Sequence, residues 1–257
     1  MKNLAALIFD VDGTLADTEK DGHRVAFNEA FRQAHLDWDW SVELYGKLLA
    51  VTGGKERIRY YLDNYRQDFT VKGELERFIA DLHRAKTAIF TDMMEQGGIP
   101  LRSGIERLFK EALQQGLQLA VATTTTMENV EALLSCNLGK EAIEWFDVIA
   151  AGDIVPHKKP APDIYFYAME QLGLTAQQCL AFEDSENGIR STTDAGLTTV
   201  ITVNDYTRDH RFNGAALVLD QLGEPNQPFH VMQGDAGSHQ YFDLDLARDI
   251  HRRYQAN

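Results

Sequence analysis

Residues 7–14 read Leu-Ile-Phe-Asp-Val-Asp-Gly-Thr, and this stretch decides the fold of the chain. The apolar run from Leu4 to Phe9 is too short for a helix and is typical of a buried strand. Residues two apart on a strand point to the same side, so Asp10 and Asp12 are expected to face one pocket if Gly13 turns the chain. Two carboxylates this close repel each other, which predicts a cation between them or a proton on one of them.

The composition of the chain excludes several classes of protein. A length of 257 residues with 44% apolar content allows one large domain, or a domain with a smaller insert. The net charge of −14 argues against a nucleic-acid partner. No apolar run approaches the length of a membrane span, so no membrane partner is expected. We expect a monomer in the cytoplasm, or in the plastid stroma if a transit peptide has been removed. Cys136 and Cys179 have no metal-type spacing and are expected to be reduced and structural.

Residues 17–93 read as almost wholly helical. Between Leu75 and Met93, apolar residues recur at the spacing of one helix face, at positions 75, 78, 79, 82, 89 and 93. Lys86 falls on the same face. A lysine on an inward-facing line either extends its ammonium to solvent or serves a site, and both interpretations remain open.

From Ile99 onward the pattern alternates between helix and strand. Strands are expected at 117–122, 146–150, 179–182, 199–203 and 216–219. Helices are expected from the capping boxes Ser103/Glu106 and Thr125/Glu128, from Pro162 to about Gly173, over 185–195, and at 244–254. This order predicts an α/β fold with a Rossmann-like parallel sheet. Residues 1–16 and 94–257 would form the core, and residues 17–93 an inserted helical cap.

Polar side chains follow three of the expected strands. Asp10 and Asp12, Thr123, and the pair Glu183-Asp184 all come at carboxyl ends, where sheets of this type bind ligands. Carboxylates that converge there favour a hard, oxygen-liganded ion such as Mg²⁺. Asp10, the carbonyl of Asp12 and Asp184 would bind it, with Glu183 bound directly or through water. An acidic pair at a helix N-terminus is the alternative for residues 183 and 184.

These residues have the chemistry of phosphoryl transfer. Asp10 is a candidate nucleophile, because carboxylates form acyl phosphates. Asp12 can protonate the leaving group and later take a proton from water. Lys159, in a loop stiffened by two prolines, would neutralise a phosphoryl oxygen to which Thr123 also donates. The alternatives are a solvated surface turn for Lys159 and a threonine that bonds local backbone groups for Thr123.

Four motifs in this order resemble those of the haloacid dehalogenase superfamily phosphatases: Asp10 to Thr14, Thr123, Lys159-Pro160 and Glu183-Asp184. The helical insert resembles the α-helical cap of that superfamily. The strings at 53–57, 83–87, 119–125, 146–153 and 158–165 are most similar to CbbY-like sugar-phosphate phosphatases. The resemblance implies hydrolysis of a small phosphorylated sugar, xylulose-1,5-bisphosphate, an inhibitory by-product of Rubisco. The segment that ends at His23 is one residue longer than the common form.

The cap carries a second candidate anion site. Gly53, Gly54, Lys55 and Arg57 form a flexible turn at the start of a helix, where backbone N–H groups and basic side chains bind anions. Lys86 points to the same place. A second anion site across the cleft suggests a substrate with two phosphates, although a solvated basic loop is the alternative.

Further residues complete the predicted substrate contacts. Glu19 and His23 are candidates for bonds to sugar hydroxyls, and Thr124 and Thr125 adjoin Thr123. His23 could equally be a packed or exposed bystander.

Two other functions compete with the phosphatase. One is a sugar phosphomutase of the β-phosphoglucomutase type, but the Lys-Asn pair associated with that enzyme is Thr126-Met127 here. The other is a non-catalytic sugar-phosphate-binding protein, which the four filled motif positions disfavour. A dehalogenase is also disfavoured, because its chemistry needs neither Asp12 nor the metal ligands.

Overall fold

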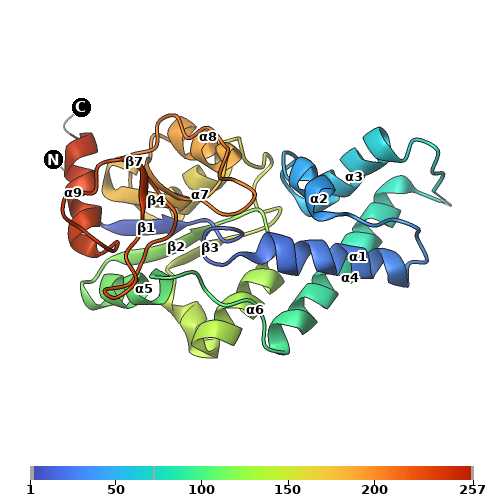
Figure 1. The fold of residues 1–257 in the computed structure, drawn as a ribbon, viewed down its shortest axis with the longest axis horizontal. Coiled ribbons are helices and arrows are strands. Elements are labelled where there is room, and N and C mark those ends of the chain that lie inside the picture. The colour runs from blue at the N-terminus through green and yellow to red at the C-terminus, as the bar shows by residue number, and fades with distance from the viewer. Residues whose placement is uncertain (1–2, 72, 256–257) are drawn as a thin grey trace.

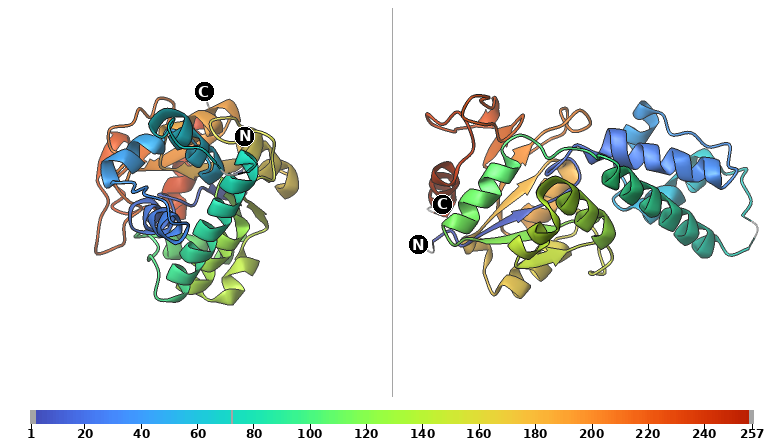
Figure 2. Two further views of the ribbon diagram at one scale, coloured as in Figure 1. Left: turned by 90° about the vertical axis from the view of Figure 1, so that its right-hand side faces the viewer. Right: turned by 90° about the horizontal axis from the view of Figure 1, so that it is seen from below.

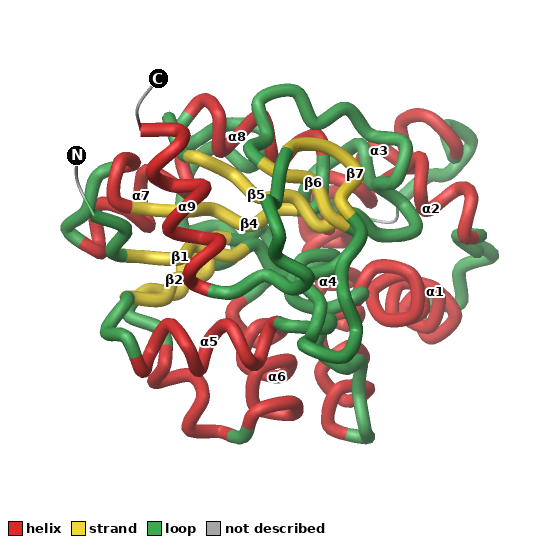
Figure 3. Tube along the Cα trace, turned by 60° about the vertical axis from the view of Figure 1, so that its left-hand side comes forward, coloured by secondary structure: helices red, strands yellow, loops and turns green. Residues whose placement is uncertain are grey.

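The structure, a computed structural model, describes residues 3–71 and 73–255. In this part of the chain, the core is a seven-stranded sheet in the order β3-β2-β1-β4-β5-β6-β7 (Figure 1). The strands are β1 (Ala6–Phe9), β2 (Gln118–Ala122), β3 (Val148–Ala150), β4 (Cys179–Glu183), β5 (Thr198–Thr202), β6 (Leu217–Leu219) and β7 (Val231–Gly234). The expected parallel sheet is confirmed for β1 to β6. The pattern of the tail does not predict β7, which pairs antiparallel with β6 at one edge (Figure 3).

Strand β1 lies in the middle of the sheet and sets the position of the site. Phe9 lies opposite Val121 on one side and Phe182 on the other. The next residues along β1 and β4, Asp10 and Glu183, therefore come to the same edge. All four residues of β1 are fully buried, and their side chains alternate between two apolar clusters on opposite faces.

Helices cover both faces of this sheet (Figures 1 and 2). They are α5 (Ile105–Gln114), α6 (Met127–Leu138), α7 (Asp163–Leu172), α8 (Glu186–Asp194) and α9 (Leu244–Gln255), with short 3₁₀ turns at Lys140–Trp145 and Ala176–Gln178. Helices α5, α6 and α9 contribute to the apolar cluster on one face, and α7 packs on the other. The helices expected from Pro162 and at 244–254 are thus confirmed.

The cap helices pack beyond the carboxyl ends of the strands (Figure 1). They are α1 (Arg24–Gln33), α2 (Val42–Leu48), α3 (Gly54–Tyr65) and α4 (Leu75–Glu95), preceded by a π-helical turn at Glu19–His23. An aromatic cluster of their own holds them together, with Phe27, Phe31, Trp38, Trp40 and Tyr45 in it. Helix α4 runs past residue 93, and the domain boundaries at 16/17 and 93/94 stay a prediction.

A π-helical turn covers Glu19–His23, in the segment where the resemblance indicates an extra residue. The N–H of Arg24 donates to the carbonyl of Glu19, five residues back rather than four. Such wide turns occur where one residue is added to a helix, often beside functional sites. This turn places His23 in a buried position that faces the core.

Both predicted capping boxes are wrong. Helix α5 begins after Gly104, which has a φ of 88°, and the Ser103 hydroxyl is buried without a partner in the described chain. The N–H of Gly104 donates instead to Glu224, whose carboxylate comes from the tail of the chain. Helix α6 begins after Thr126, and no side chain caps it. A partner 120 residues away replaces the local cap of α5, and sequence spacing cannot reveal it.

Among the described residues, none of the helices combines the length and the apolar character necessary to cross a membrane.

Candidate active site

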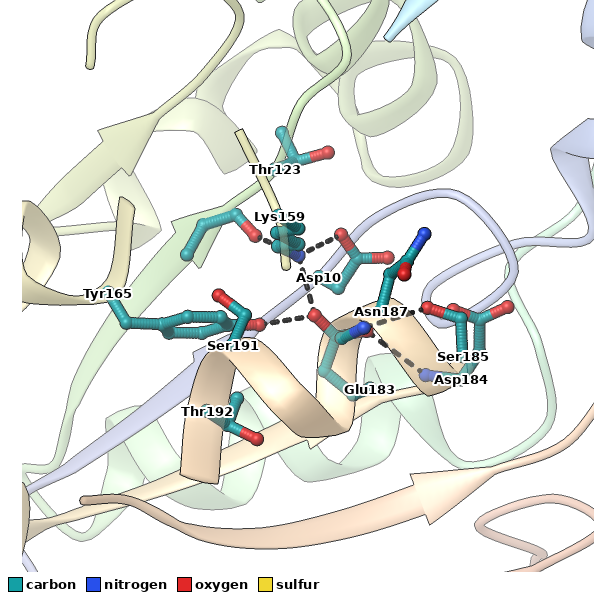
Figure 4. Close-up of polar contacts among 12 residues, drawn as sticks. Asp10, Thr123, Lys159, Tyr165, Glu183, Asp184, Ser185, Asn187, Ser191 and Thr192 are labelled. Carbon is teal, nitrogen blue, oxygen red and sulfur yellow. Dashed lines mark hydrogen bonds and ion pairs between the residues drawn. The ribbon is translucent and has the colours of Figure 1, made fainter. Parts of the chain in front are cut away.

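Three carboxylates converge at the carboxyl edge of the sheet (Figure 4). Asp10 follows β1, Glu183 ends β4 and Asp184 follows it, and one ligand atom of each lies within 4.8 Å of the others. All three are buried. Burial of three like charges is costly unless a cation is shared. A donor set of oxygen atoms alone fits a hard divalent ion such as Mg²⁺.

The ammonium group of Lys159 lies inside this cluster of three carboxylates. It donates to Asp10 Oδ1 at 2.6 Å, to Glu183 Oε1 at 2.6 Å and to the carbonyl of Ala122 at 2.9 Å. Burial alone would lower its pKa, but Asp10 and Glu183 outweigh burial and hold the pKa above its usual range. Lys159 is therefore charged and fully hydrogen-bonded, which excludes a solvated surface turn.

Opposing effects of burial and of Lys159 set the pKa of Asp10. Burial raises its pKa, Lys159 lowers it, and the result is a pKa of about 7. For Asp184, burial together with Asp10 and Glu183 holds the pKa well above its ordinary range. Both acids would lose their protons readily on gaining a cation, as metal binding requires.

The Asp184 carboxylate is oriented by a residue that sequence reasoning missed. Asn204 Nδ2 donates to Asp184 Oδ2 at 2.7 Å, and Asn204 Oδ1 accepts the N–H of Tyr206 at 2.9 Å. Gly13 lies directly against this pair, because a Cβ there would come within 2.4 Å of Asp184 Oδ2. With a φ of 90° as well, position 13 accepts glycine alone.

Asp12 points toward the cap and does not join the three carboxylates. Its Oδ1 accepts from Thr18 Oγ1 at 2.6 Å and lies 2.8 Å from His23 Nε2. Burial would raise the pKa of Asp12, but His23 and Thr18 outweigh it and hold the pKa well below its usual range. The other ring nitrogen of His23 lies 2.7 Å from Lys86 Nζ. Both nitrogens of His23 are thus engaged within the protein.

Arg57 and Glu19 reach the site from the cap. Arg57 is buried and donates to the hydroxyl of Tyr45 at 2.9 Å. That hydroxyl donates to Glu19 Oε2 at 2.6 Å, and Arg57 Nη1 lies 4.0 Å from the same Glu19 Oε2. Together with Asp10 and Lys159, Arg57 and Glu19 line a cavity of about 330 Å³ between cap and core.

Thr123, Thr124 and Thr125 lie on the core side of this space. Thr123 is buried, and its Oγ1 accepts the N–H of Thr125 at 3.2 Å, which leaves the hydroxyl proton available to a ligand. Thr124 lines the main cavity and two smaller ones beside it. One of these smaller cavities, of about 40 Å³, is also lined by Lys86, Arg57 and Thr125.

Lys55 lies outside the cavity that the three carboxylates line. It is 39% exposed and pairs with Asp153 of the core. Lys158 bonds the same Asp153 at 2.9 Å and Glu56 at 2.9 Å, so this network joins the cap to the core. Lys55, Lys158 and His83 line the third cavity, of about 230 Å³, with Gly54. Gly53, next to it, has a φ of 97°.

His83 is a second residue that sequence reasoning missed. Burial and the nearby Lys86, Lys55, Lys158 and His23 lower its pKa to about 3, so the imidazole is neutral. In the sequence it begins the string 83–87 that carries the family resemblance, three residues before Lys86 on one helix.

The comparisons with known proteins agree with this geometry. Residues 4–196 match the haloacid dehalogenase-like hydrolases. A CbbY protein of Cupriavidus necator is 44% identical over 250 residues, which cover 96% of this chain and 97% of that protein. The chain belongs to the haloacid dehalogenase-like hydrolases, among the CbbY proteins.

Solved structures of CbbY show the same fold. Two structures of CbbY from Rhodobacter sphaeroides, both 48% identical, cover 85% of this chain and 94% of their own. One contains phosphate, with a TM-score of 0.80, and the other is a variant with asparagine in place of an aspartate, bound to xylulose-1,5-bisphosphate, with a TM-score of 0.79. A β-phosphoglucomutase of Clostridium difficile, 19% identical with a TM-score of 0.75, shares the fold over 99% of this chain and all of that one. This CbbY-family chain is therefore an enzyme, a hydrolase.

Proposed function

We propose that this hydrolase is a Mg²⁺-dependent phosphatase that removes a phosphate from xylulose-1,5-bisphosphate through an aspartyl-phosphate intermediate. The position of Asp10 is the observation that carries the proposal. Its carboxylate lies at a strand end, 2.6 Å from a charged lysine and within 4.8 Å of two further carboxylates. The complex of the related CbbY with this bisphosphate supports the choice of substrate.

The proposed reaction has two steps. Asp10 attacks the phosphorus through one carboxylate oxygen, the bond from phosphorus to the sugar oxygen breaks, and Asp12 gives that oxygen a proton. Water then attacks the phosphorus with loss of a proton to Asp12, which releases phosphate and restores Asp10. A bound Mg²⁺, held by Asp10, Asp184, the carbonyl of Asp12 and Glu183, would neutralise the phosphoryl oxygens.

The low pKa of Asp12 keeps it ionised at neutral pH, the state in which it can accept the proton of water in the second step. For the first step it must hold a proton, and the contacts of its Oδ1 with Thr18 and His23 keep the carboxylate in place for both steps. Thr123 and Lys159 would stabilise the charge that develops on the phosphoryl group.

The distal phosphate of the substrate would lie between cap and core. The chain carries a net charge of −14, yet Arg57, Lys86, Lys55 and Lys158 gather on this side of the site, close to Thr124 and Thr125. Lys86 is buried and has no carboxylate within ion-pair distance in the described chain. An anionic ligand would supply the missing countercharge. Gly53 and Gly54, where the turn enters α3, would let the backbone approach that ligand, and Glu19 would bind a sugar hydroxyl.

The test is release of inorganic phosphate from xylulose-1,5-bisphosphate by the full chain with Mg²⁺. We expect turnover without any bisphosphate activator, and none with Asp10→Asn, whereas Asp63→Asn on the exposed side of α3 keeps full activity. Isomerised sugar phosphate without free phosphate would show the mutase instead. Unchanged turnover by Asp10→Asn would reject the nucleophile. We also expect a monomer that acts in the cytoplasm or plastid stroma.

A further inference from the structure

The Glu183 carboxylate is held on all sides by donors and by packing. Its Oε1 accepts from Lys159 Nζ at 2.6 Å and from the hydroxyl of Tyr165 at 2.5 Å (Figure 4). Its Oε2 accepts the N–H of Asp184 at 3.3 Å. A Cβ at Gly188 would lie only 1.9 Å from Oε2, so helix α8 closes the remaining side. These contacts fix the orientation of the Glu183 carboxylate.

Tyr165 is the donor in this set that comes from a helix. It lies on α7, is completely buried, and packs among the apolar residues that cover β1 and β4. Burial and then Glu183 hold the pKa of Tyr165 well above its usual range, so its hydroxyl remains a donor at any working pH. The Lys159 ammonium lies 5.1 Å from the centre of the same ring.

The bond from Tyr165 decides what Glu183 can do for its neighbours. Lys159 has three N–H groups, and the structure assigns one each to Asp10, Glu183 and Ala122. Because Tyr165 fixes Oε1, Lys159 is held with one N–H directed at Asp10. Because the carboxylate cannot turn, Glu183 also stays in the group of three acids that fits a divalent ion.

We infer that Tyr165 is a positioning residue of this site, which acts through Glu183 on the metal ion and on Lys159. Residues that bond to metal-binding carboxylates typically change metal affinity or activity by about 10- to 100-fold when they are replaced. Only the expected change in kcat rests on the proposed function. Metal binding can be read on the protein without substrate.

The test compares two tyrosines on the same helix. Tyr165→Phe removes one oxygen and keeps the ring, and Tyr167→Phe makes the same change two residues along. Tyr167 is only partly buried against the same apolar cluster, and its hydroxyl bonds no residue in the described chain. Mg²⁺ binding is measured by calorimetry, and kcat and KM by phosphate release.

We expect Tyr165→Phe to weaken Mg²⁺ binding by about 10-fold and to lower kcat by a similar factor, with KM within about twofold. Tyr167→Phe should change none of these. A fall in melting temperature shared by both variants would reflect lost packing, and it leaves the Mg²⁺ constant as the deciding value. Unchanged Mg²⁺ binding and kcat in a folded Tyr165→Phe protein would overturn the inference.

A double variant tests whether the effect passes through Glu183. If it does, Tyr165→Phe combined with Glu183→Gln should match Glu183→Gln alone within about twofold in Mg²⁺ affinity. Effects that multiply would mean that Tyr165 acts by another route and would also overturn the inference. If the wild-type protein releases no phosphate from the bisphosphate but binds Mg²⁺, the proposed substrate fails while this comparison remains decisive.

Discussion

Lys86 shows how burial turns an ordinary side chain into a pH-dependent one. Burial lowers its pKa, nearby Asp12 and Glu19 raise it in part, and the result is a pKa of about 8 instead of 10.5. Its ammonium lies 2.7 Å from His23 and beside a cavity that we assign to the distal phosphate. The charge that would attract this phosphate is therefore lost at a pH where ordinary lysines keep theirs.

We expect kcat/KM for the bisphosphate to fall above about pH 8 as Lys86 loses its proton, with the loss mainly in KM. The pH profile of kcat/KM reports the groups of the free enzyme, so it is the measurement to make. Lys86→Met should give a low kcat/KM with no such fall. A wild-type profile that is flat from pH 7 to about 9.5, or the same fall in Lys86→Met, would contradict this prediction.

Individual site residues differed in how far the sequence could place them. Asp10, Glu183 and Asp184 were predictable, because parallel strands end at one edge and each acid follows an apolar run. The helix face of α4 that carries Lys86 was also predictable. The sequence did not show whether the Lys86 ammonium reaches solvent, and the structure buries this side chain. Tyr165 and Asn204 bond to acids on other elements, so only the folded chain brings them into contact.

Among the elements, helix α5 shows that a distant carboxylate can replace a local cap. Glu224 Oε1 accepts the N–H of Gly104 at 3.0 Å, and its Oε2 accepts from Arg107 at 2.9 Å. The hydroxyl of Ser103, which the spacing favoured as the cap, has no hydrogen-bond partner in the part of the chain that the structure describes. The tail after Gly223 therefore has a structural role in the core that its weak sequence pattern conceals.

Replacing Glu224 by alanine should lower the free energy of unfolding by about 1 kcal/mol, the usual cost of losing a helix cap. Ser103→Ala is the matched control, and it should leave the free energy of unfolding within about 0.5 kcal/mol of wild type. Urea unfolding of the three proteins measures both values. A larger loss from Ser103→Ala than from Glu224→Ala would restore the local capping box.

The elements themselves followed the sequence closely, with exceptions that have physical causes. Strand ends and the helix from Pro162 agree with the pattern, because apolar periodicity and proline act locally. The π-helical turn before α1 could be noticed only as an extra residue, and it packs against the cap helices α1 and α4. Strand β7 is exposed along its whole length, so it carries no apolar pattern to predict it.

For the whole molecule, the charges on the cap and the core favour the arrangement that covers the site. Asp153 of the core pairs with Lys55 of the cap, and Lys158 of the core bonds Glu56 of the cap at 2.9 Å. Lys55 is the hydrogen-bond partner that does most to lower the pKa of Asp153, which lies at about 2. The two pairs join segments about 100 residues apart. Residues of both pairs line the cavity of about 230 Å³ that Thr124 also lines.

Asp153→Asn should therefore raise KM and leave kcat nearly unchanged, because it weakens the contact between cap and core without touching the reacting groups. Exposed ion pairs are worth at most about 1 kcal/mol each, which corresponds to about a fivefold rise in KM. Asp37→Asn is the control, since Asp37 pairs with Arg66 inside the cap and bridges nothing. Salt screens such pairs, so the difference between Asp153→Asn and wild type should shrink from about 20 mM to about 500 mM sodium chloride. An equal rise in KM from Asp37→Asn, or a difference that persists at high salt, would show that the ion pair between cap and core does not affect substrate binding.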